Sequence, residues 1–327
     1  MISISASEVA QHSPYPALIA ALSRGLLEPI QTPPRSHFNP NADASTVLVM
    51  PAWKPHDIMG VKLVSIWPGN NAQGLPAVSG VYVLSSCADG RPLAVLDGTE
   101  LTLRRTAATA ALGAKLLARP ASRRLAVLGT GALALPMVLA HSQVFNLTHI
   151  CIWGRKLDNA HAVVDALAQQ GIQAQASTDL QAVLADTDVA VTVTTATQPF
   201  IRADWVQPGT HLGLVGAFTP DMAEAEPALM PRARIYADTT EGVLQKGGEV
   251  LQAIRAGLIA QSDVRGELAQ LLHPTQALAG RATAQDITVF KTVGFAALDL
   301  ISAELIYKNC GTDLVYGAAE TVSSPSD

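Results

Sequence analysis

A glycine-rich turn between two short apolar segments constrains this chain most. Residues 125–128 are wholly apolar, Gly129-Thr130-Gly131 follows at once, and residues 135–141 continue as an apolar run of helical character. Residues 149–153 then form a second apolar segment. A continuous apolar run is typical of a strand buried on both faces, and so tight a turn favours glycine. The pattern predicts a strand, turn, helix and strand whose helix N-terminus can bind a pyrophosphate.

The glycine pattern is GxGxxA, because Ala134 stands where a third glycine is common. The alternative is an ordinary glycine turn in an α/β protein, but both flanking strands fall where a dinucleotide-binding unit needs them. The turn therefore predicts cofactor contacts from five consecutive residues: Gly129, Thr130, Gly131, Ala132 and Leu133.

The end of the second strand indicates which dinucleotide is bound. An acidic residue there would bond the ribose 2′-hydroxyl of NAD, but this chain has Trp153-Gly154-Arg155-Lys156. Two cations without a carboxylate suit a 2′-phosphate, which arginine can bind with two parallel hydrogen bonds. A solvated basic turn is the alternative. We predict that these four residues contact the cofactor, and that the cofactor is NADPH (NADP), with NADH less favoured.

The order of predicted elements indicates two domains. Strands at 47–52, 60–67, 79–86 and 92–96 have short connections, which favours an antiparallel sheet, and helices are predicted at 5–28 and 99–118. Beyond Pro120 strands alternate with helices, which implies a parallel sheet. We predict an α/β fold: a Rossmann doubly wound parallel sheet (119–292) inserted into a second, α+β, substrate-binding domain (1–118 plus 293–327).

Ligands of such sheets bind beyond the carboxyl ends of the strands. Thr195, Thr197, Ala217 and Phe218 are therefore candidates to line the nicotinamide pocket. The further predicted cofactor contacts follow later strands of the sheet and are Thr194, Thr195, Ala196, Thr197, Val215, Gly216, Lys291 and Gly294.

Three cations stand in unusual places. Lys62 interrupts a run that would otherwise be wholly buried, and buried lysines are rare unless paired or functional. Arg105 lies near a predicted helix start, where a cation is unfavourable without an anion, and Arg35 follows Pro33-Pro34. These cations could converge on a small carboxylate. The alternative is separate salt bridges to Asp57, Asp97 or Glu100.

Composition excludes several classes of function. The net charge of −5 gives no reason to expect nucleic acid or an anionic membrane as a partner. The three cysteines are far apart and the eight histidines show no ligand spacing, so no metal is predicted. No apolar run approaches the ~20 residues of a membrane span, and the N-terminus lacks the features of a signal peptide. We expect a cytoplasmic protein.

Several segments together resemble the ornithine cyclodeaminase/μ-crystallin family over nearly the whole chain. They are GVKLVSIWPGN at 60–70, DGTELTLRRTAATAAL at 97–112, GTGALA at 129–134, VTTAT at 193–197, THLGLVGAFTPDMAEAEPAL at 210–229 and ITVFKTVGFAALDL at 287–300. The resemblance implies a Rossmann domain joined to a substrate and dimerisation domain, and hence a homodimer. It also implies that the residues matching Arg35, Lys62 and Arg105 hold the carboxylate of a small amino or imino acid.

One departure from the family pattern bears on the reaction. Members that cyclodeaminate ornithine carry an acidic residue after a glycine-rich pair, where this chain has Gly216-Ala217-Phe218. Phenylalanine cannot serve as a base, and the GAF-TP loop resembles that of members that reduce cyclic ketimines. Phe218 is therefore predicted to contact the substrate ring; the alternative is that Phe218 is a core residue and that Asp221 acts as the base.

The sequence thus predicts an NADPH-dependent ketimine reductase. Its substrate would be Δ1-pyrroline-2-carboxylate, reduced to L-proline, and its six-membered homologue Δ1-piperideine-2-carboxylate, reduced to L-pipecolate. Lys62, Arg105 and Arg35 are the predicted catalytic residues, and Phe218 joins them in substrate binding. The alternatives are an ornithine cyclodeaminase, another NAD(P)-dependent amino-acid dehydrogenase, or a μ-crystallin-like protein that binds NADPH and a small ligand.

Overall fold

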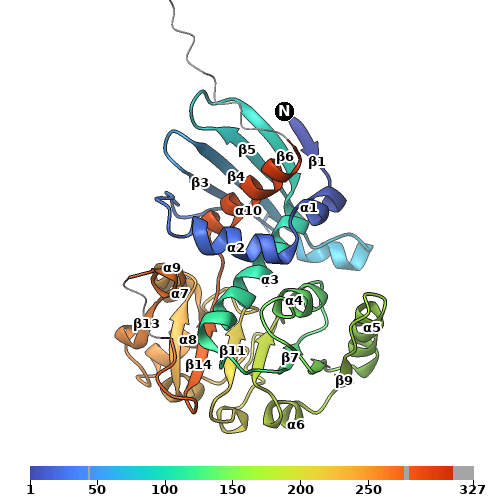
Figure 1. Cartoon of the computed structure of the whole chain (residues 1–327), viewed down its shortest axis with the longest axis vertical. Helices are drawn as coiled ribbons and strands as arrows, with labels where there is room; N and C mark the ends of the chain where they lie inside the picture. Colours follow the sequence, from blue (N-terminus) through green and yellow to red (C-terminus); the bar gives the residue numbers. More distant parts are fainter. Residues whose placement is uncertain (43–44, 276–279, 312–327) are drawn as a thin grey trace, which may run out of the picture.

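The strands of this protein form two separate sheets. The computed structural model describes residues 1–42, 45–275 and 280–311. Within these ranges one sheet has six strands and the other eight. Figure 1 shows the sheets in two lobes, with the long helix α3 (Gly98–Leu117) running between them. The predicted fold class is confirmed; residues 312–327 of the predicted first domain lie outside the described residues.

The six-stranded sheet has the order β1-β6-β5-β4-β3-β2. Four of its neighbouring pairs are antiparallel, as predicted, but β1 pairs with β6 in parallel. The short strands β1 and β2 were not predicted, because three residues are too few to give a clear alternation. The strands are β1 (Ile2–Ile4), β2 (Ser36–Phe38), β3 (Thr46–Trp53), β4 (Ile58–Ile66), β5 (Val78–Ser86) and β6 (Pro92–Asp97).

The single helix predicted over residues 5–28 is wrong. The structure has two helices there, α1 (Ala6–His12) and α2 (Tyr15–Gly25). Pro14 separates them, because proline disfavours a helical conformation at the preceding residue and is itself acceptable only at a helix start. Ser5 caps α1 by accepting a hydrogen bond from the Glu8 amide.

The eight-stranded sheet is parallel throughout its described pairs and has the order β13-β12-β14-β11-β10-β7-β8-β9. The chain leaves β7 in one direction through β8 and β9, and in the other through β10 and β11, so the switch point lies between β7 and β10. Its strands are β7 (Arg124–Leu128), β8 (His149–Trp153), β9 (Gln175–Ser177), β10 (Val189–Thr192), β11 (His211–Leu214), β12 (Ala233–Ala237), β13 (Val264–Glu267) and β14 (Ile287–Lys291).

Helices cover both faces of the parallel sheet (Figure 1). They are α4 (Ala134–His141), α5 (Leu157–Ala168), α6 (Leu180–Ala185), α7 (Thr240–Lys246), α8 (Gly248–Arg255) and α9 (Leu268–Leu272). Four short 3-10 helices complete the described elements: η1 (Pro68–Gln73), η2 (Ala203–Trp205), η3 (Pro227–Arg232) and η4 (Gln261–Asp263).

The strand that carries Lys62 is half-buried rather than wholly buried, which corrects the expectation from its apolar sequence. Ile58, Gly60 and Lys62 face inward, whereas Val61 and Leu63 are 38% and 41% exposed. Alternation along a strand sends successive side chains to opposite faces, so Lys62 lies on the covered face. The part of the outer face formed by Val61, Leu63 and Val81 is apolar and exposed.

The last helix, α10 (Ala296–Asn309), covers the inner face of the six-stranded sheet. It contacts β3, β4, α2 and α3, and Figure 1 shows it lying across that sheet. The chain therefore returns to the first lobe after β14. This return places Asp299, in the first turn of α10, against residues from β4 and α3.

Candidate active site

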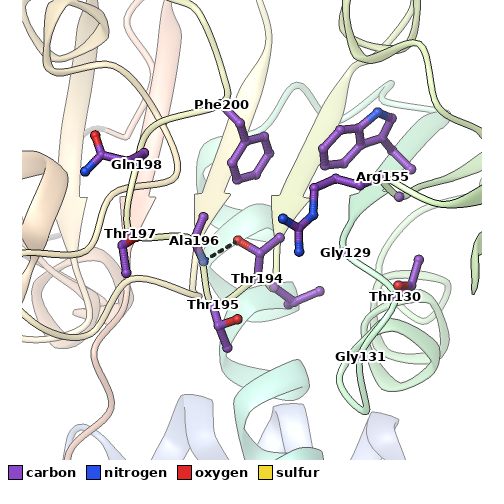
Figure 2. Close-up of a pocket in the computed structure, with 13 residues that line it drawn as sticks. Gly129, Thr130, Gly131, Arg155, Thr194, Thr195, Ala196, Thr197, Gln198 and Phe200 are labelled. Carbon is purple, nitrogen blue, oxygen red and sulfur yellow. Dashed lines mark hydrogen bonds between the residues drawn. The ribbon is translucent and has the colours of Figure 1, made fainter.

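A cavity of about 460 Å³ opens at the carboxyl ends of β7, β8 and β10. Gly129 follows β7 with φ of +135°, and a Cβ there would lie 2.8 Å from the carbonyl oxygen of Val193. Only glycine fits this turn without strain. The lining of this dinucleotide cavity (Figure 2) consists of Gly129, Thr130, Gly131, Trp153, Gly154, Arg155, Val193, Thr194, Thr195, Ala196, Thr197, Gln198 and Phe200.

The dinucleotide cavity fits a pyrophosphate. Leu133, the N-cap of α4, offers no side-chain hydrogen bond to the first helical turn, so a bound anion can be the acceptor there. A Cβ on Gly131 would meet no atom within 4 Å, which leaves room for a ligand beside the backbone. These features suit a nicotinamide dinucleotide, whose chemistry is hydride transfer.

Several predicted cofactor residues lie outside the lining of this cavity: Ala132, Leu133, Lys156, Val215, Gly216, Lys291 and Gly294. Lys291 is fully buried, and its Nζ lies 2.9 Å from Oε2 of Glu249. The sequence predicted the position of Lys291 at the end of a strand, but it did not predict Glu249 as its partner. The cavity also includes Phe200 and Gln198, which sequence reasoning missed because the loop after β10 has no periodic pattern.

Arg155 borders the cavity at the end of β8. Its side chain is exposed, and Figure 2 draws it directed into the cavity. Beside it Trp153 stacks on Phe200 with ring centroids 5.2 Å apart, while the Trp153 indole donates to the carbonyl of Thr178. A cation next to two aromatic rings gives this end of the cavity both a charge and an apolar surface.

Lys62 and Arg105 share one buried carboxylate, that of Asp299. Oδ1 of Asp299 accepts from Nζ of Lys62 at 2.8 Å and from Nε of Arg105 at 2.9 Å. Asp299 is fully buried and Lys62 is 2% exposed. The sequence alternative of separate salt bridges to Asp57, Asp97 or Glu100 is therefore wrong for these two cations. Asp97 instead caps α3 by accepting from the Glu100 amide.

Burial and charge set the protonation of this group. Burial, reinforced by the charge of Arg105, lowers the pKa of Lys62 to about 8, although Asp299 acts in the opposite direction. Burial alone would raise the pKa of Asp299, but Arg105 and Lys62 hold it below its usual range. The site thus contains an ionised carboxylate and a lysine that can change its charge near physiological pH.

Arg35 completes the predicted cation trio. Its Nη2 donates to the carbonyls of Val293 and Gly294, at 3.2 and 2.5 Å. A Cβ on Gly294 would lie 3.0 Å from Nη1 of Arg105, so Gly294 stands between the two guanidinium groups. Burial and Arg105 together lower the pKa of Arg35. We call Arg35, Lys62 and Arg105 the cation cluster.

A second cavity, of about 110 Å³, is lined by Arg35 of the cation cluster, whereas Lys62 and Arg105 line neither this cavity nor the dinucleotide cavity. Arg35 and Met50 line it from the first lobe, Gly242 and Lys246 from the second, and Gly294 from the connection between them. Lys246 was not predicted; burial and the charge of Arg35 lower its pKa to about 8. Glu241 also lines this cavity, so its charged lining of Arg35, Lys246 and Glu241 has a net positive charge, which favours an anionic ligand.

Phe218 lines neither of these two cavities. It lies in the loop after β11 and is 44% exposed, so the alternative that it is a core residue is wrong. Asp221 in the same loop is also exposed. A contact between Phe218 and substrate stays a prediction.

No helix within residues 1–42, 45–275 and 280–311 has the length and apolar character needed to cross a membrane. Nor, in those ranges, do three or more histidine, cysteine, aspartate or glutamate side chains gather where they could hold a metal ion.

A family model for the ornithine cyclodeaminase/mu-crystallin family matches residues 5–313. The Δ(1)-pyrroline-2-carboxylate reductase of Paracoccus denitrificans is 38% identical over 264 residues, covering 80% of this chain and 82% of that protein. Mouse ketimine reductase mu-crystallin is 31% identical over 313 residues, covering 93% and 96%. The structure of Thermococcus litoralis Δ(1)-pyrroline-2-carboxylate reductase with NADH and L-proline matches with a TM-score of 0.89, at 27% identity, covering 95% and 97%.

The parallel sheet, its glycine turn and these relatives define an NAD(P)H-dependent oxidoreductase that acts on carbon–nitrogen bonds. The chain belongs to the ornithine cyclodeaminase/mu-crystallin family. The resemblance predicted from the sequence motifs is thereby confirmed.

Proposed function

We propose that this protein reduces Δ1-pyrroline-2-carboxylate to L-proline, and Δ1-piperideine-2-carboxylate to L-pipecolate, with NADPH. The observation that carries the proposal is the buried carboxylate of Asp299, which holds Lys62 and Arg105 in one place beside Arg35. Two relatives whose names specify pyrroline-2-carboxylate or ketimine reduction support it.

The cation cluster has distinct roles in this reaction. Arg35 and Arg105 bind the substrate carboxylate, since a guanidinium can offer two parallel donors. Lys62 donates a proton from Nζ to the ring nitrogen, because a lysine with a pKa near 8 is an effective acid at neutral pH. When bound, NADPH supplies the hydride that reduces the C=N bond. Asp299 keeps both cations oriented without touching substrate.

Turnover assays test this proposal against its alternatives. We expect NADPH oxidation with both cyclic imines, and negligible ammonia release from ornithine, because Phe218 replaces the acidic residue that cyclodeamination needs. Robust ammonia release that is lost in Asp221→Asn would contradict the proposal and assign the base to Asp221. Tight NADPH binding with no turnover of either imine would instead favour a binding protein.

The pH dependence of kcat/KM for imine reduction should follow the protonation of Lys62. The acid form is the donor, so kcat/KM for imine reduction should fall about tenfold per pH unit above a pKa near 8. Lys62→Arg keeps the positive charge but does not titrate in this range. Initial rates from pH 6 to 10 should therefore show the alkaline decline in the wild type and not in Lys62→Arg. A decline at the same pH in both proteins would exclude Lys62 as its source.

We also propose a homodimer formed through the outer face of the six-stranded sheet. The outer patch consists of Val61, Leu63, Val81 and Val83, and Leu63 lies directly opposite Val81 across β4 and β5. Three of the four are 38–41% exposed, and a contiguous apolar patch favours association.

Introducing a charge into the outer patch should separate the subunits. We expect Leu63→Glu to sediment as a monomer at micromolar concentration, where the wild type sediments as a dimer, because a carboxylate buried in an apolar interface costs several kcal/mol. Leu258→Glu, at a position 43% exposed outside the patch, is the matched control and should remain dimeric. A wild-type monomer, or a dimeric Leu63→Glu, would count against this interface.

A further inference from the structure

The carboxylate of Glu224 is buried and lies between two loops of the parallel sheet. Its Oε1 accepts from the amide and the hydroxyl of Thr194, at 2.8 and 2.7 Å, in the loop after β10. Its Oε2 accepts from the amides of Gly216 and Ala217, at 2.7 and 3.3 Å, in the loop after β11. The Thr192 hydroxyl donates a fifth hydrogen bond, at 2.6 Å. One side chain thus joins the ends of two neighbouring strands.

The backbone of Glu224 holds the other end of the first loop. Its carbonyl accepts from the amides of Phe200 and Ile201, at 3.1 and 3.0 Å. Residues 194–200 line the dinucleotide cavity almost continuously, so Glu224 fixes both the start and the end of this lining. The Thr194 hydroxyl that donates to Glu224 also accepts a hydrogen bond from the Ala196 amide, as Figure 2 shows.

The two loops approach each other so closely at Glu224 that Gly216 has no space for a side chain. A Cβ on Gly216 would lie 2.1 Å from the Thr194 carbonyl and 2.3 Å from Oε1 of Glu224, so the two loops meet there without space for a side chain. The Glu224 amide donates to Oε1 of Glu249, whose other oxygen faces Lys291 at the end of β14. A fully satisfied buried carboxylate of this kind restricts the groups around it to one arrangement.

We propose that Glu224 is a positioning residue for the dinucleotide: its side chain holds the start of the loop after β10, and the loop after β11, in the arrangement that binds the nicotinamide half. It acts through Thr194 and Gly216 and does not touch the cofactor. The adenosine half, by contrast, is bound at the end of β8, where Arg155 lies and Trp153 stacks on Phe200. Glu224 reaches that end only through its backbone carbonyl, which a change of its side chain leaves in place. The inference rests on the dinucleotide binding of the proposed function and not on the identity of the imino acid.

Glu224→Gln tests this role, because its amide nitrogen donates and cannot accept from the loop amides. We expect the Kd for NADPH to rise about tenfold or more. The Kd for 2′,5′-ADP, which carries only the adenosine half, should change less than about twofold. Both constants can be measured by isothermal titration calorimetry on the full chain. Glu226→Gln is the matched control, since Glu226 accepts from the Ala203 amide outside the cavity lining, and it should leave both constants unchanged.

Thr194→Val provides a milder second variant that removes one of the five donors. It should weaken NADPH binding in the same direction by a smaller factor, again without affecting 2′,5′-ADP. Unchanged NADPH affinity in Glu224→Gln would overturn the proposal, as would an equal loss of both ligands, which indicates a general structural role. A further outcome is a wild type that binds NADPH but reduces neither imine. If Glu224→Gln then still loses NADPH binding selectively, the result would support the positioning role of Glu224 and contradict the proposed substrate.

Discussion

Replacing Asp299 with asparagine should lower kcat/KM for imine reduction by about two to three orders of magnitude. The substitution leaves the charges of Lys62 and Arg105 buried without a counter-ion, and breaking such a buried pair costs about 3–5 kcal/mol. Both cations must then reorient or lose charge, and the substrate carboxylate and the proton donor are misplaced together. Steady-state kinetics with NADPH and either cyclic imine measure the effect, and denaturant unfolding measures the loss of stability.

Glu304→Gln is the matched control for this prediction. Glu304 lies on the same helix, and it too joins two cations, Lys54 and Lys308, at 2.6 Å each. Neither cation belongs to the cation cluster, so this variant should lose stability but keep kcat/KM within about threefold of the wild type. Equal losses of activity in Asp299→Asn and Glu304→Gln would show that Asp299 acts only through stability.

Arg155→Asp should lower the preference for NADPH over NADH by about two orders of magnitude. The substitution removes a guanidinium that can bind the 2′-phosphate and puts a carboxylate in its place. The carboxylate repels that phosphate but can accept from the 2′-hydroxyl of NADH. The ratio of Kd values for the two reduced cofactors, measured by fluorescence titration, reports the change directly.

Lys156→Asp separates a direct contact from a general effect of charge. Lys156 is adjacent to Arg155 but does not line the dinucleotide cavity. It should act only through screened Coulomb attraction, so the selectivity ratio should change by about threefold. Equal affinity of the wild type for NADPH and NADH would contradict the predicted preference for NADPH. Unchanged selectivity in Arg155→Asp would contradict Arg155 as its source. The comparison of the two cofactors is needed because the structure of the Thermococcus relative contains NADH.

The sequence alone determined most of the parallel half of this protein and the turn at its centre. Local rules were sufficient there, because a doubly wound sheet repeats short apolar strands and helices of characteristic length, and Gly129 occupies a conformation that other residues avoid. Local rules also predicted that Lys62, Arg35 and Arg105 are unusual cations. They failed at the short strands over residues 2–4, 36–38 and 264–267 and at Pro14, because short segments and a helix break carry little periodic signal.

Only the tertiary structure decided which groups neutralise and orient these residues. Asp299 lies 237 positions from Lys62 and 194 from Arg105, and nothing in its local sequence marks it as their shared partner. Glu224 likewise is separated from Thr194 by 30 positions and reaches it across neighbouring strand ends. The physical reason is that burial makes an unpaired charge costly wherever it lies in the sequence. The fold, rather than the local pattern, therefore selects the partner.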